Sequence, residues 1–482
     1  MSKKSFYITT TLPYVNAQAH MGHALEFVRA DIIARYQKRN GFDVFFNTGT
    51  DEHGMKILEA AKKSGQSPKE YVDDYSSRFR KLLPLLGVSD EIHFIRTTDV
   101  RHEKAAQEFW NRVAKNGYIY KKNYKTKYCI GCEEEKTDSE LVNGICPIHP
   151  NRALEIIEEE NYFFKFSAFA DKLLAFYEKN PNFIVPEMRL NEMKEFIKRG
   201  LEDFSISRLK SKMPWGVEVP GDGEHVMYVW FDALTNYIST LGWPDSLSDF
   251  EKYWVNGTPV QYCGKDNTRF QSVMWQAMLI GADLPNTNRV IVNGFVTGEG
   301  GVKMSKSLGN VVDPLDVIRE YGTDALRYFV TREIHPFEDS PFSVERLKVA
   351  YNANLANGLG NLVSRVMKMA TSYGVSEITP VSNKEDLIKT YNENIESFNL
   401  QKAADIIWKI IGDADAFIQT QAPFKKIKID EVGAKKDVAI LLGYLDLVSY
   451  LLEIFLPETT TKIQDCLKNN VMPKEALFLR KE

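Results

Sequence analysis

Short runs of aromatic and β-branched residues alternate with a helical spacing of apolar positions near the start of the chain. Phe6–Thr10 and Asp43–Asn47 are such runs, and Gly22–Asn40 between them has apolar residues three and four positions apart. A strand, a helix and a strand joined by short connections are typical of a parallel α/β sheet. We therefore predict a Rossmann-type parallel sheet for this region.

This pattern is interrupted and then resumes. Between residues 118 and 225 the chain has a cysteine cluster, an acidic run and several short β-like pieces. Val226–Trp230, Val260–Gly264 and Arg289–Val296 are again strand-like. The order indicates one α/β domain that contains an insertion.

The last part of the chain has few strand signals. Val344–Tyr373 and Lys384–Ile418 have the apolar spacing of long amphipathic helices, which predicts a helical bundle. The predicted segments are the first half of the sheet domain at 1–117, the insertion at 118–225, the second half at 226–300, a loop region at 301–343 and the helical domain at 344–482.

Composition narrows the class of protein. The 482 residues include 61 Lys and Arg against 65 Asp and Glu, a net charge of −4, so a nucleic-acid binder of this composition must concentrate its basic residues locally. No apolar run reaches the length of about 18 residues that a membrane helix needs. Met1–Lys4 leads directly into the strand-like Ser5–Thr11, with no signal-peptide pattern. We expect a cytoplasmic protein with no membrane association.

The first chemical motif is Leu12–His23, which reads LPYVNAQAHMGH. His20 and His23 stand at the predicted start of a helix, where unpaired N–H groups and the helix dipole favour phosphate. Gly22 between them has no side chain to keep a flat base away from the backbone. Taken alone, the motif fits ordinary capping and surface histidines equally well.

The second motif is Lys303–Ser307, which reads KMSKS and lies in a glycine-rich loop after a predicted strand. Two lysines on such a loop can close over a triphosphate and neutralise its charge. A solvated basic turn is the alternative for this pentapeptide alone. In this order, and each at an α/β turn, HMGH and KMSKS resemble the two ATP motifs of class I aminoacyl-tRNA synthetases.

The class resemblance implies a catalytic role for four side chains. His20 and His23 would bind the phosphates of ATP, Gly22 would lie against adenine, and Lys303 and Lys306 would bind the triphosphate together with Mg²⁺. Because the carboxylate of an amino acid is already ionised, activation needs alignment and charge stabilisation, and it needs no general base. The two motifs would then meet at one nucleotide.

Further motifs resemble the methionyl-tRNA synthetases. They are LPY at Leu12–Tyr14, TGTDEHG at Thr48–Gly54, YVWFDAL at Tyr228–Leu234, GKD at Gly264–Asp266 and SLGN after KMSKS. The resemblance implies a methionine–tRNA ligase, which converts methionine and ATP into methionyl-adenylate and pyrophosphate. It then transfers methionyl to the 3′ end of tRNA(Met), for translation initiation and elongation.

The same resemblance implies the residues that bind methionine and ATP. Asp266 would reach the ATP ribose, and Asp51 would bind the methionine ammonium. The implied methionine-binding residues are Leu12, Tyr14, Asp51, Trp230, Ala233, Tyr237, Phe270 and Gln271. Asn267 and Gln271 depart from the isoleucine and histidine usual in the family, and Leu234 and Asn293 also differ from common choices.

A metal site is predicted in the insertion. Cys129-x₂-Cys132 and Cys146-x₂-His149 are separated by thirteen residues, and two such pairs suit tetrahedral Zn²⁺. Buried free thiols are the alternative, although the surrounding sequence is polar. The resemblance implies one structural zinc ion per chain in a single knuckle. The remaining cysteines, Cys263 and Cys466, are predicted to be buried thiols.

The predicted bundle contains candidate tRNA contacts. Asn357, Asn361 and Arg365 are four apart and share one face of a helix. Amides and a guanidinium suit the edges of bases exposed in a loop. The family resemblance implies that these residues and Phe424, which follows Pro423, bind the anticodon. A solvated helix face and a packed phenylalanine are the alternative.

Three other functions compete with this one: a class I synthetase for another amino acid, a non-catalytic tRNA-binding relative, and a plain nucleotidyltransferase. Intact His20, His23, Lys303, Lys306 and Asp51 favour catalysis, and the helical domain favours a tRNA substrate. The expected partners are tRNA(Met), ATP and L-methionine. We expect a monomer, because no further tRNA-binding barrel fits before Glu482.

Overall fold

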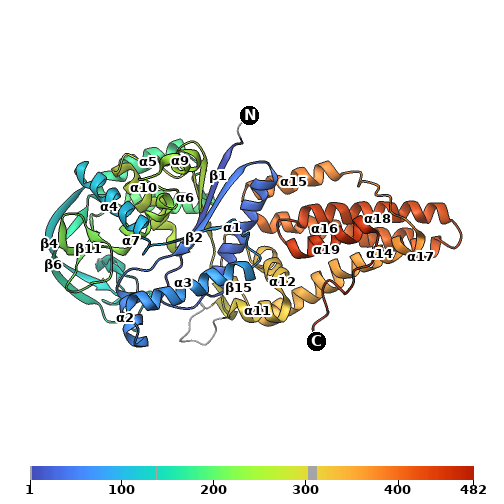
Figure 1. Ribbon diagram of the computed structural model, residues 1–482, viewed down its shortest axis with the longest axis horizontal. Coiled ribbons are helices and arrows are strands. Elements are labelled where there is room, and N and C mark those ends of the chain that lie inside the picture. The colour runs from blue at the N-terminus through green and yellow to red at the C-terminus, as the bar shows by residue number, and fades with distance from the viewer. Residues whose placement is uncertain (1–2, 137, 302–311) are drawn as a thin grey trace. The chain divides into compact units, whose positions relative to one another are not determined.

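The computed structural model describes residues 3–136, 138–301 and 312–482 (Figure 1). It divides into two compact units. The first comprises Met1–Gln18, Gly41–Leu82 and Asp90–Val292, and the second comprises Ala19–Asn40, Leu83–Ser89 and Asn293–Glu482. Helix α1 (Met21–Arg39) follows β1 in the chain but belongs to the second unit.

A six-stranded sheet forms the centre of the first unit, in the order β3-β2-β1-β12-β13-β7. The strands are β1 (Ser5–Thr10), β2 (Asp43–Thr50), β3 (His93–Arg96), β7 (Ile184–Val185), β12 (Thr258–Gly264) and β13 (Arg289–Asn293). β1 pairs in parallel with both β2 and β12. β1 is buried from Phe6 to Thr10, as expected for a strand covered on both faces. The predicted parallel α/β fold is confirmed.

Helices connect and cover these strands. Those of the first unit are α2 (Met55–Ser64), α3 (Pro68–Leu85, whose end lies in the second unit), α4 (Val100–Lys115), α5 (Ala170–Lys179), α6 (Glu187–Lys198), α7 (Val229–Ala233), α8 (Asn236–Ser239), α9 (Leu247–Asp249) and α10 (Trp275–Gly281). The large aromatic core of this unit includes Phe109, Phe231 and Trp275.

Antiparallel strands dominate the inserted segment. β4 (Ile119–Cys129), β5 (Glu134–Lys136), β6 (Glu155–Phe164) and β8 (Phe204–Ser205) form one sheet in the order β5-β4-β6-β8. β9 (Ser207–Leu209), β10 (Glu218–Val219) and β11 (Asp222–Met227) form another. β7 lies in the same stretch of sequence but pairs with β13 of the main sheet. The predicted segment boundaries stay predictions.

The predicted strand Val226–Trp230 is wrong in its second half. β11 ends at Met227, and α7 begins at Val229 after the extended residue Tyr228. Both pieces are buried, and a short apolar run has the same pattern in a buried strand and in a buried helix.

The described residues of the second unit are mainly helical, and they also form the strand pair β14 (Val296–Thr297) and β15 (Ser340–Pro341). Besides α1 it contains α11 (Pro314–Tyr321), α12 (Thr323–Tyr328), α13 (Val344–Ala350), α14 (Asn361–Tyr373), α15 (Lys384–Glu396), α16 (Leu400–Gln421), α17 (Pro423–Lys426), α18 (Glu431–Leu452) and α19 (Pro457–Asn469). The predicted C-terminal helical domain is confirmed. In the part of the chain that the structure describes, no helix has both the length and the apolarity to cross a bilayer.

The predicted helix Lys384–Ile418 is two helices. α15 ends at Glu396, and Phe398 adopts a φ of +60°, which ordinary side chains rarely adopt. The side chain of Asn399 then caps α16 by accepting a hydrogen bond of 3.2 Å from the backbone of Lys402. The apolar period continues through the break, so periodicity alone did not locate it.

Two fully buried arginines hold the second unit together. Arg327 of α12 pairs with Asp31 of α1 at 2.8 Å and donates to the carbonyls of Phe455 and Ile454 at 2.7 and 3.0 Å. Arg29 donates to the carbonyls of residues 330, 334, 335 and 336. Buried charge is tolerated here because each guanidinium has several acceptors.

Replacing Arg327 by methionine therefore tests how the second unit is stabilised. The change leaves the Asp31 carboxylate and the carbonyls of residues 86, 87, 454 and 455 without this partner, and we expect it to lower the free energy of unfolding by about 3 kcal/mol. The matched control is Arg319→Met, which removes an exposed pair with Asp316 and should cost less than about 1 kcal/mol. Urea unfolding measures both, and equal effects would contradict this account.

Candidate functional site

The carboxyl ends of three adjacent strands in the first unit position the predicted binding residues. β1 leads into Leu12 and Tyr14, β2 into Asp51, and β12 into Asp266. Tyr14 and Asp51 form a short parallel bridge, in which the backbone N–H of Asp51 donates to Pro13 at 2.9 Å. In parallel sheets this edge is where ligands bind.

Asp51 is a buried carboxylate without a full set of partners. Its side chain is buried, and its Oδ1 atom has no hydrogen-bond partner among the residues that the structure describes. Burial raises the pKa of Asp51 well above its usual value, and the carboxylates of Asp232 and Glu133 raise it further. An arriving cation would relieve the cost of this buried negative charge.

Aromatic side chains form another group among the predicted methionine-binding residues. The rings of Trp230 and Phe270 stack with a centroid distance of 3.7 Å and an interplanar angle of 6°. The indole N–H of Trp230 is buried and has no hydrogen-bond partner within the described part of the chain. Leu12 and Ala233 are also buried. Tyr237 packs into the aromatic core with its ring 5.8 Å from that of Trp275.

Gln271 is held on both sides of its amide. Its Nε2 donates to the hydroxyl of Thr11 at 2.8 Å, and its Oε1 accepts from Gln261 of β12 at 3.1 Å. The amide of Asn267 donates to Asp266 at 3.3 Å, and Asp266 is exposed. Two residues that depart from the family pattern therefore have local partners.

The motif residue Asp232 belongs to a buried polar network whose role we did not predict. It lies 2.7 Å from Nδ1 of His53 and 2.8 Å from Nε2 of His102. Burial opposes ionisation, but the two histidines hold the pKa of Asp232 below its usual value, and Asp232 raises the pKa of His53. His53 and Asp232 were visible in the motifs, whereas no sequence signal pointed to His102.

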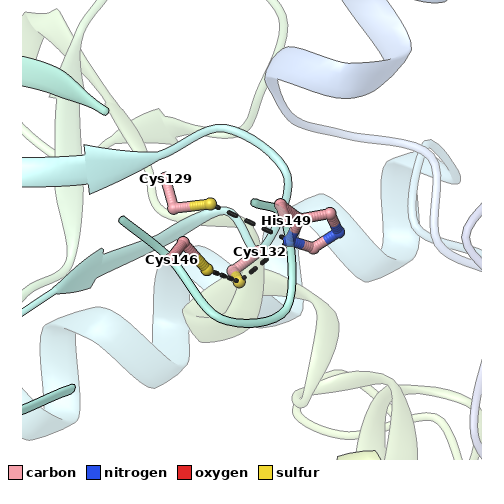
Figure 2. A group of neighbouring side chains, drawn as sticks. All are labelled: Cys129, Cys132, Cys146 and His149. Atoms are coloured by element: carbon pink, nitrogen blue, oxygen red, sulfur yellow. Dashed lines mark hydrogen bonds between the residues drawn. The ribbon is translucent and has the colours of Figure 1, made fainter. Parts of the chain in front are cut away.

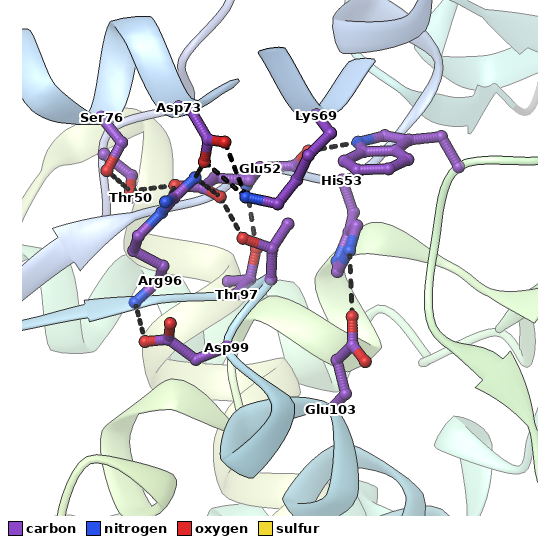
Figure 3. A network of polar contacts seen from close by, with 12 residues as sticks. Thr50, Glu52, His53, Lys69, Asp73, Ser76, Arg96, Thr97, Asp99 and Glu103 are labelled. Atoms are coloured by element: carbon purple, nitrogen blue, oxygen red, sulfur yellow. Dashed lines mark hydrogen bonds and ion pairs between the residues drawn. The ribbon is translucent and has the colours of Figure 1, made fainter. Parts of the chain in front are cut away.

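Glu52, beside Asp51, is also buried and, like Asp232, is paired with positively charged or hydrogen-bonding groups (Figure 3). Arg96 binds it in a bidentate pair at 2.7 and 2.8 Å, and the hydroxyl of Thr50 donates to it at 2.6 Å. The indole of Trp215 donates to the backbone carbonyl of Glu52 at 2.6 Å. The segment that carries Asp51 is thus fixed on several sides.

His20 and His23 form the start of α1 in the second unit. Nδ1 of His20 accepts from the backbone of Gly22 at 3.1 Å, and Nδ1 of His23 accepts from the backbone of His20 at 3.2 Å. Burial and the neighbouring His20 lower the pKa of His23 well below its usual value. A neutral ring whose Nδ1 accepts carries its proton on Nε2, which makes Nε2 a hydrogen-bond donor.

The structure gives a steric reason for a glycine at residue 22. A Cβ atom there would lie 2.9 Å from Cε1 of the His20 ring, so glycine makes room for the capping imidazole. The predicted approach of adenine to Gly22 stays a prediction. Lys303 and Lys306 lie outside the described residues, so the predicted meeting of the two ATP motifs also stays a prediction.

The predicted knuckle ligands come together in the inserted segment (Figure 2). The four donor atoms of Cys129, Cys132, Cys146 and His149 all lie within 4.8 Å of one another. Nδ1 of His149 is 3.3 Å from the sulfur of Cys132, which is 3.5 Å from that of Cys146. This cluster can hold a metal ion. Cys263 and Cys466 are buried, as predicted.

The local sequence folds tightly enough to bring these donors together. The backbone N–H of Cys132 donates to Cys129, and that of His149 donates to Cys146, so each x₂ pair is one turn. A Cβ atom at residue 131 would lie 2.4 Å from the His149 ring, so Gly131 permits the second pair to close on the first.

The predicted anticodon residues lie in the second unit on or beside α14 and in α17. Asn357 and Asn361 are exposed. Arg365 is half-buried and pairs with Asp415 at 3.0 Å. The ring of Phe424 is 43% exposed, which leaves a face on which a base could stack.

Comparisons with known families match both parts of the chain. Residues 6–155 and 140–367 match the family described as class I tRNA synthetases (M). Residues 368–476 match the family described as the anticodon-binding domain of methionyl tRNA ligase.

Individual relatives agree with these matches. A methionine–tRNA ligase of Caldanaerobacter subterraneus is 41% identical over 96% of this chain and 73% of its own length. One of Brucella suis is 39% identical over 97% of this chain and 92% of its own length. A structure of the Mycobacterium tuberculosis methionyl-tRNA synthetase in complex with methionyl-adenylate superposes with a TM-score of 0.89, at 36% identity over 96% of this chain and 93% of that chain.

The four knuckle ligands predict that the protein binds a metal ion, and this can be tested without an activity assay. We expect the purified protein to contain about one equivalent of a sulfur-binding divalent metal, because three thiolates and an imidazole form a soft, closed donor set. Cys146→Ser should lose that metal, whereas Cys466→Ser in the bundle should keep it. Elemental analysis measures both, and equal metal content in the two variants would refute the assignment.

Proposed function

The chain belongs to the methionyl-tRNA synthetases of class I, and we propose how its residues carry out the ligation of methionine to tRNA(Met). The enzyme activates methionine with ATP and then charges the tRNA. The observation that carries the proposal for the amino-acid site is the buried Asp51 carboxylate, whose Oδ1 has no partner in residues 3–136, 138–301 and 312–482.

Asp51 binds the ammonium group of methionine. A buried carboxylate with a raised pKa and an unpaired oxygen is stabilised in its ionised form when a cation arrives. The neighbouring carboxylates have partners of their own: Glu52 is paired with Arg96, and Asp232 with two histidines. Glu133 accepts hydrogen bonds from the hydroxyl of Tyr14 and the backbone N–H of Lys56.

The thioether of methionine lies against the aromatic pair Trp230 and Phe270, with Leu12, Ala233 and Tyr14 completing the slot. Sulfur contacts with aromatic rings contribute roughly 0.3–1.5 kcal/mol each, which favours methionine over a branched aliphatic side chain of similar size. Tyr237, whose ring packs against Trp275 in the core, and Gln271, which is held by Thr11, complete the methionine-binding residues of the proposal.

ATP is bound by donors from the two ATP motifs. His20 and His23 donate from Nε2 to phosphate oxygens, a role supported by the acceptor role of both Nδ1 atoms. Lys303 and Lys306 bind the triphosphate, Asp266 accepts from the ribose, and Gly22 lies against adenine. Mg²⁺, when bound with ATP, supplies further positive charge for the pyrophosphate that leaves.

The chemistry follows in two transfers. An oxygen of the methionine carboxylate attacks the α-phosphorus, the bond from that phosphorus to the bridging oxygen breaks, and pyrophosphate leaves. A hydroxyl at the 3′ end of the tRNA then attacks the methionyl carbonyl carbon, and AMP leaves. The side chains align the reactants and stabilise the extra negative charge on phosphorus.

The knuckle binds one structural Zn²⁺. Tetrahedral zinc, with Zn–S of about 2.3 Å and Zn–N of about 2.0–2.1 Å, needs S···S edges of about 3.8 Å and S···N edges of about 3.6 Å. The corresponding separations here are 3.5 Å between Cys132 and Cys146, and 3.3 and 3.8 Å from His149 to Cys132 and Cys129. Four protein ligands leave no open position for a substrate.

Asn357, Asn361, Arg365 and Phe424 read the anticodon. The exposed amides offer both donors and acceptors to base edges, and the exposed ring of Phe424 offers a stacking surface beside Lys425. We also propose a monomer that acts in the cytoplasm.

Exchange of radiolabelled pyrophosphate into ATP tests the activation step. We expect exchange that depends on methionine, and Lys306→Ala should reduce it by a factor of about 10² or more, because charge stabilisation of this kind is worth several kcal/mol. Asp51→Asn should raise the methionine KM by about tenfold or more. Lys63→Ala, an exposed change on α2, is the control.

The alternatives give different results in that assay. Exchange driven by leucine or cysteine in place of methionine would indicate a synthetase of another specificity. Absence of exchange with every amino acid would indicate a tRNA-binding relative without activity.

The anticodon assignment predicts a separation of the two steps. Asn361→Ala and Arg365→Ala should leave exchange unchanged and lower kcat/KM for charging of tRNA with a CAU anticodon by about tenfold or more, since contacts to a base are worth roughly 1–3 kcal/mol. Asn394→Ala on α15 is the control. Equal losses in exchange and charging would remove these residues from the anticodon site.

A further inference from the structure

Glu133, directly after the knuckle residue Cys132, has an unusual position. Its φ is +55°, in the left-handed region that residues other than glycine rarely adopt, and its side chain is only 4% exposed. Its backbone N–H donates to the carbonyl of Cys129 at 2.8 Å, so this conformation is part of the tight turn that holds two knuckle cysteines. Such a backbone outlier justifies asking what its side chain does.

The carboxylate of Glu133 reaches two groups far away in sequence. Its Oε1 accepts from the hydroxyl of Tyr14 at 2.8 Å and from the backbone N–H of Lys56 at 3.0 Å. Lys56 lies in the first turn of α2, whose N-cap is Gly54 and has no side chain to cap the helix. Glu133 therefore supplies the cap from another segment, and it fixes the phenol of Tyr14 with the same oxygen.

No room remains for a further side chain at residue 54, beside the contact between Glu133 and Tyr14. Gly54 has a φ of +105°, and a Cβ atom there would lie 2.6 Å from the Tyr14 hydroxyl and 3.0 Å from Oε1 of Glu133. The last residue of the TGTDEHG motif is thus a glycine where these two side chains meet. The backbone carbonyl of Glu133 also accepts from Tyr228 at 2.5 Å, two residues before Trp230.

Glu133 consequently contacts three segments of the proposed methionine slot: Tyr14, the start of α2 just after Asp51, and the residue that leads to Trp230. We propose that Glu133 is a positioning residue for methionine binding, through which the knuckle fixes the amino-acid site. This inference rests on the proposed function. The metal-binding turn then has a role in the site beyond the stability of its own segment, because the turn sets where the carboxylate lies.

Substitutions at residue 133 test this role. Glu133→Ala removes the acceptor, and we expect it to raise the methionine Kd, measured by calorimetry without ATP, and the methionine KM by about tenfold, with the ATP KM and the metal content unchanged. Glu133→Gln keeps an oxygen acceptor and should stay within about threefold of the wild type. Glu134→Ala is the matched control, because its carboxylate pairs with Lys136 on the knuckle itself.

A double-mutant cycle separates positioning from general weakening. Combined with Tyr14→Phe, which removes the other partner of the hydrogen bond, Glu133→Ala should add little to the rise in methionine Kd. Removal of the metal with a chelator should likewise weaken methionine binding in the wild type and add little in Glu133→Ala.

These measurements distinguish failure of this inference from failure of the proposed function. A wild type without methionine-dependent exchange would refute the proposed function. An active wild type with a Glu133→Ala variant that contains its metal and binds methionine equally well would overturn the positioning role alone. Additive losses in the cycle would overturn it too.

Discussion

A buried carboxylate is costly unless a positive charge or several donors compensate it, and the proposed amino-acid site depends on this constraint. Asp51 and Glu52 are followed directly by His53, which pairs with a third buried carboxylate, Asp232. Glu52 has Arg96 and two hydroxyls, and Asp232 has two imidazoles. Asp51 is the carboxylate among these three that has an unpaired oxygen. The arrangement therefore directs the affinity for a cation to one atom.

The compensated carboxylates also keep that atom in place. Arg96 binds the side chain of Glu52 and Trp215 binds its backbone carbonyl, while His53 pairs with Asp232 of α7. Asp51 lies between these anchored residues and in a backbone bridge with Tyr14. A mobile carboxylate could turn towards water, whereas this one is held where its burial favours an ammonium group. Preorganisation of this kind avoids an entropic cost on binding.

The sequence predicted what is local or carried by a motif, and it did not predict contacts over long separations. The knuckle ligands followed from spacing, because two x₂ turns bring four donors within reach. The contacts of Glu133 with Tyr14 and of His102 with Asp232 join residues more than a hundred positions apart, and no periodicity records them. The break at Phe398 was missed because the apolar pattern is continuous across it. The end of β11 was missed because a buried strand and a buried helical turn have the same composition.

Gln271 stands where the family usually has histidine, and its role can be inferred only from the residues that its amide contacts. In the structure Nε2 of Gln271 donates to Thr11, and its oxygen accepts from Gln261, which in turn accepts from Thr287. This chain of hydrogen bonds links the end of β1 to β12. It fixes the orientation of the Gln271 amide, because both its nitrogen and its oxygen already have partners. Because that amide is already bonded to Thr11 and Gln261, discrimination of the methionine side chain in the proposed slot falls mainly to shape and to the stacked rings of Trp230 and Phe270. A slot of that kind separates side chains by polarizability and volume, so it distinguishes methionine from leucine by a modest factor for each contact and needs several contacts together.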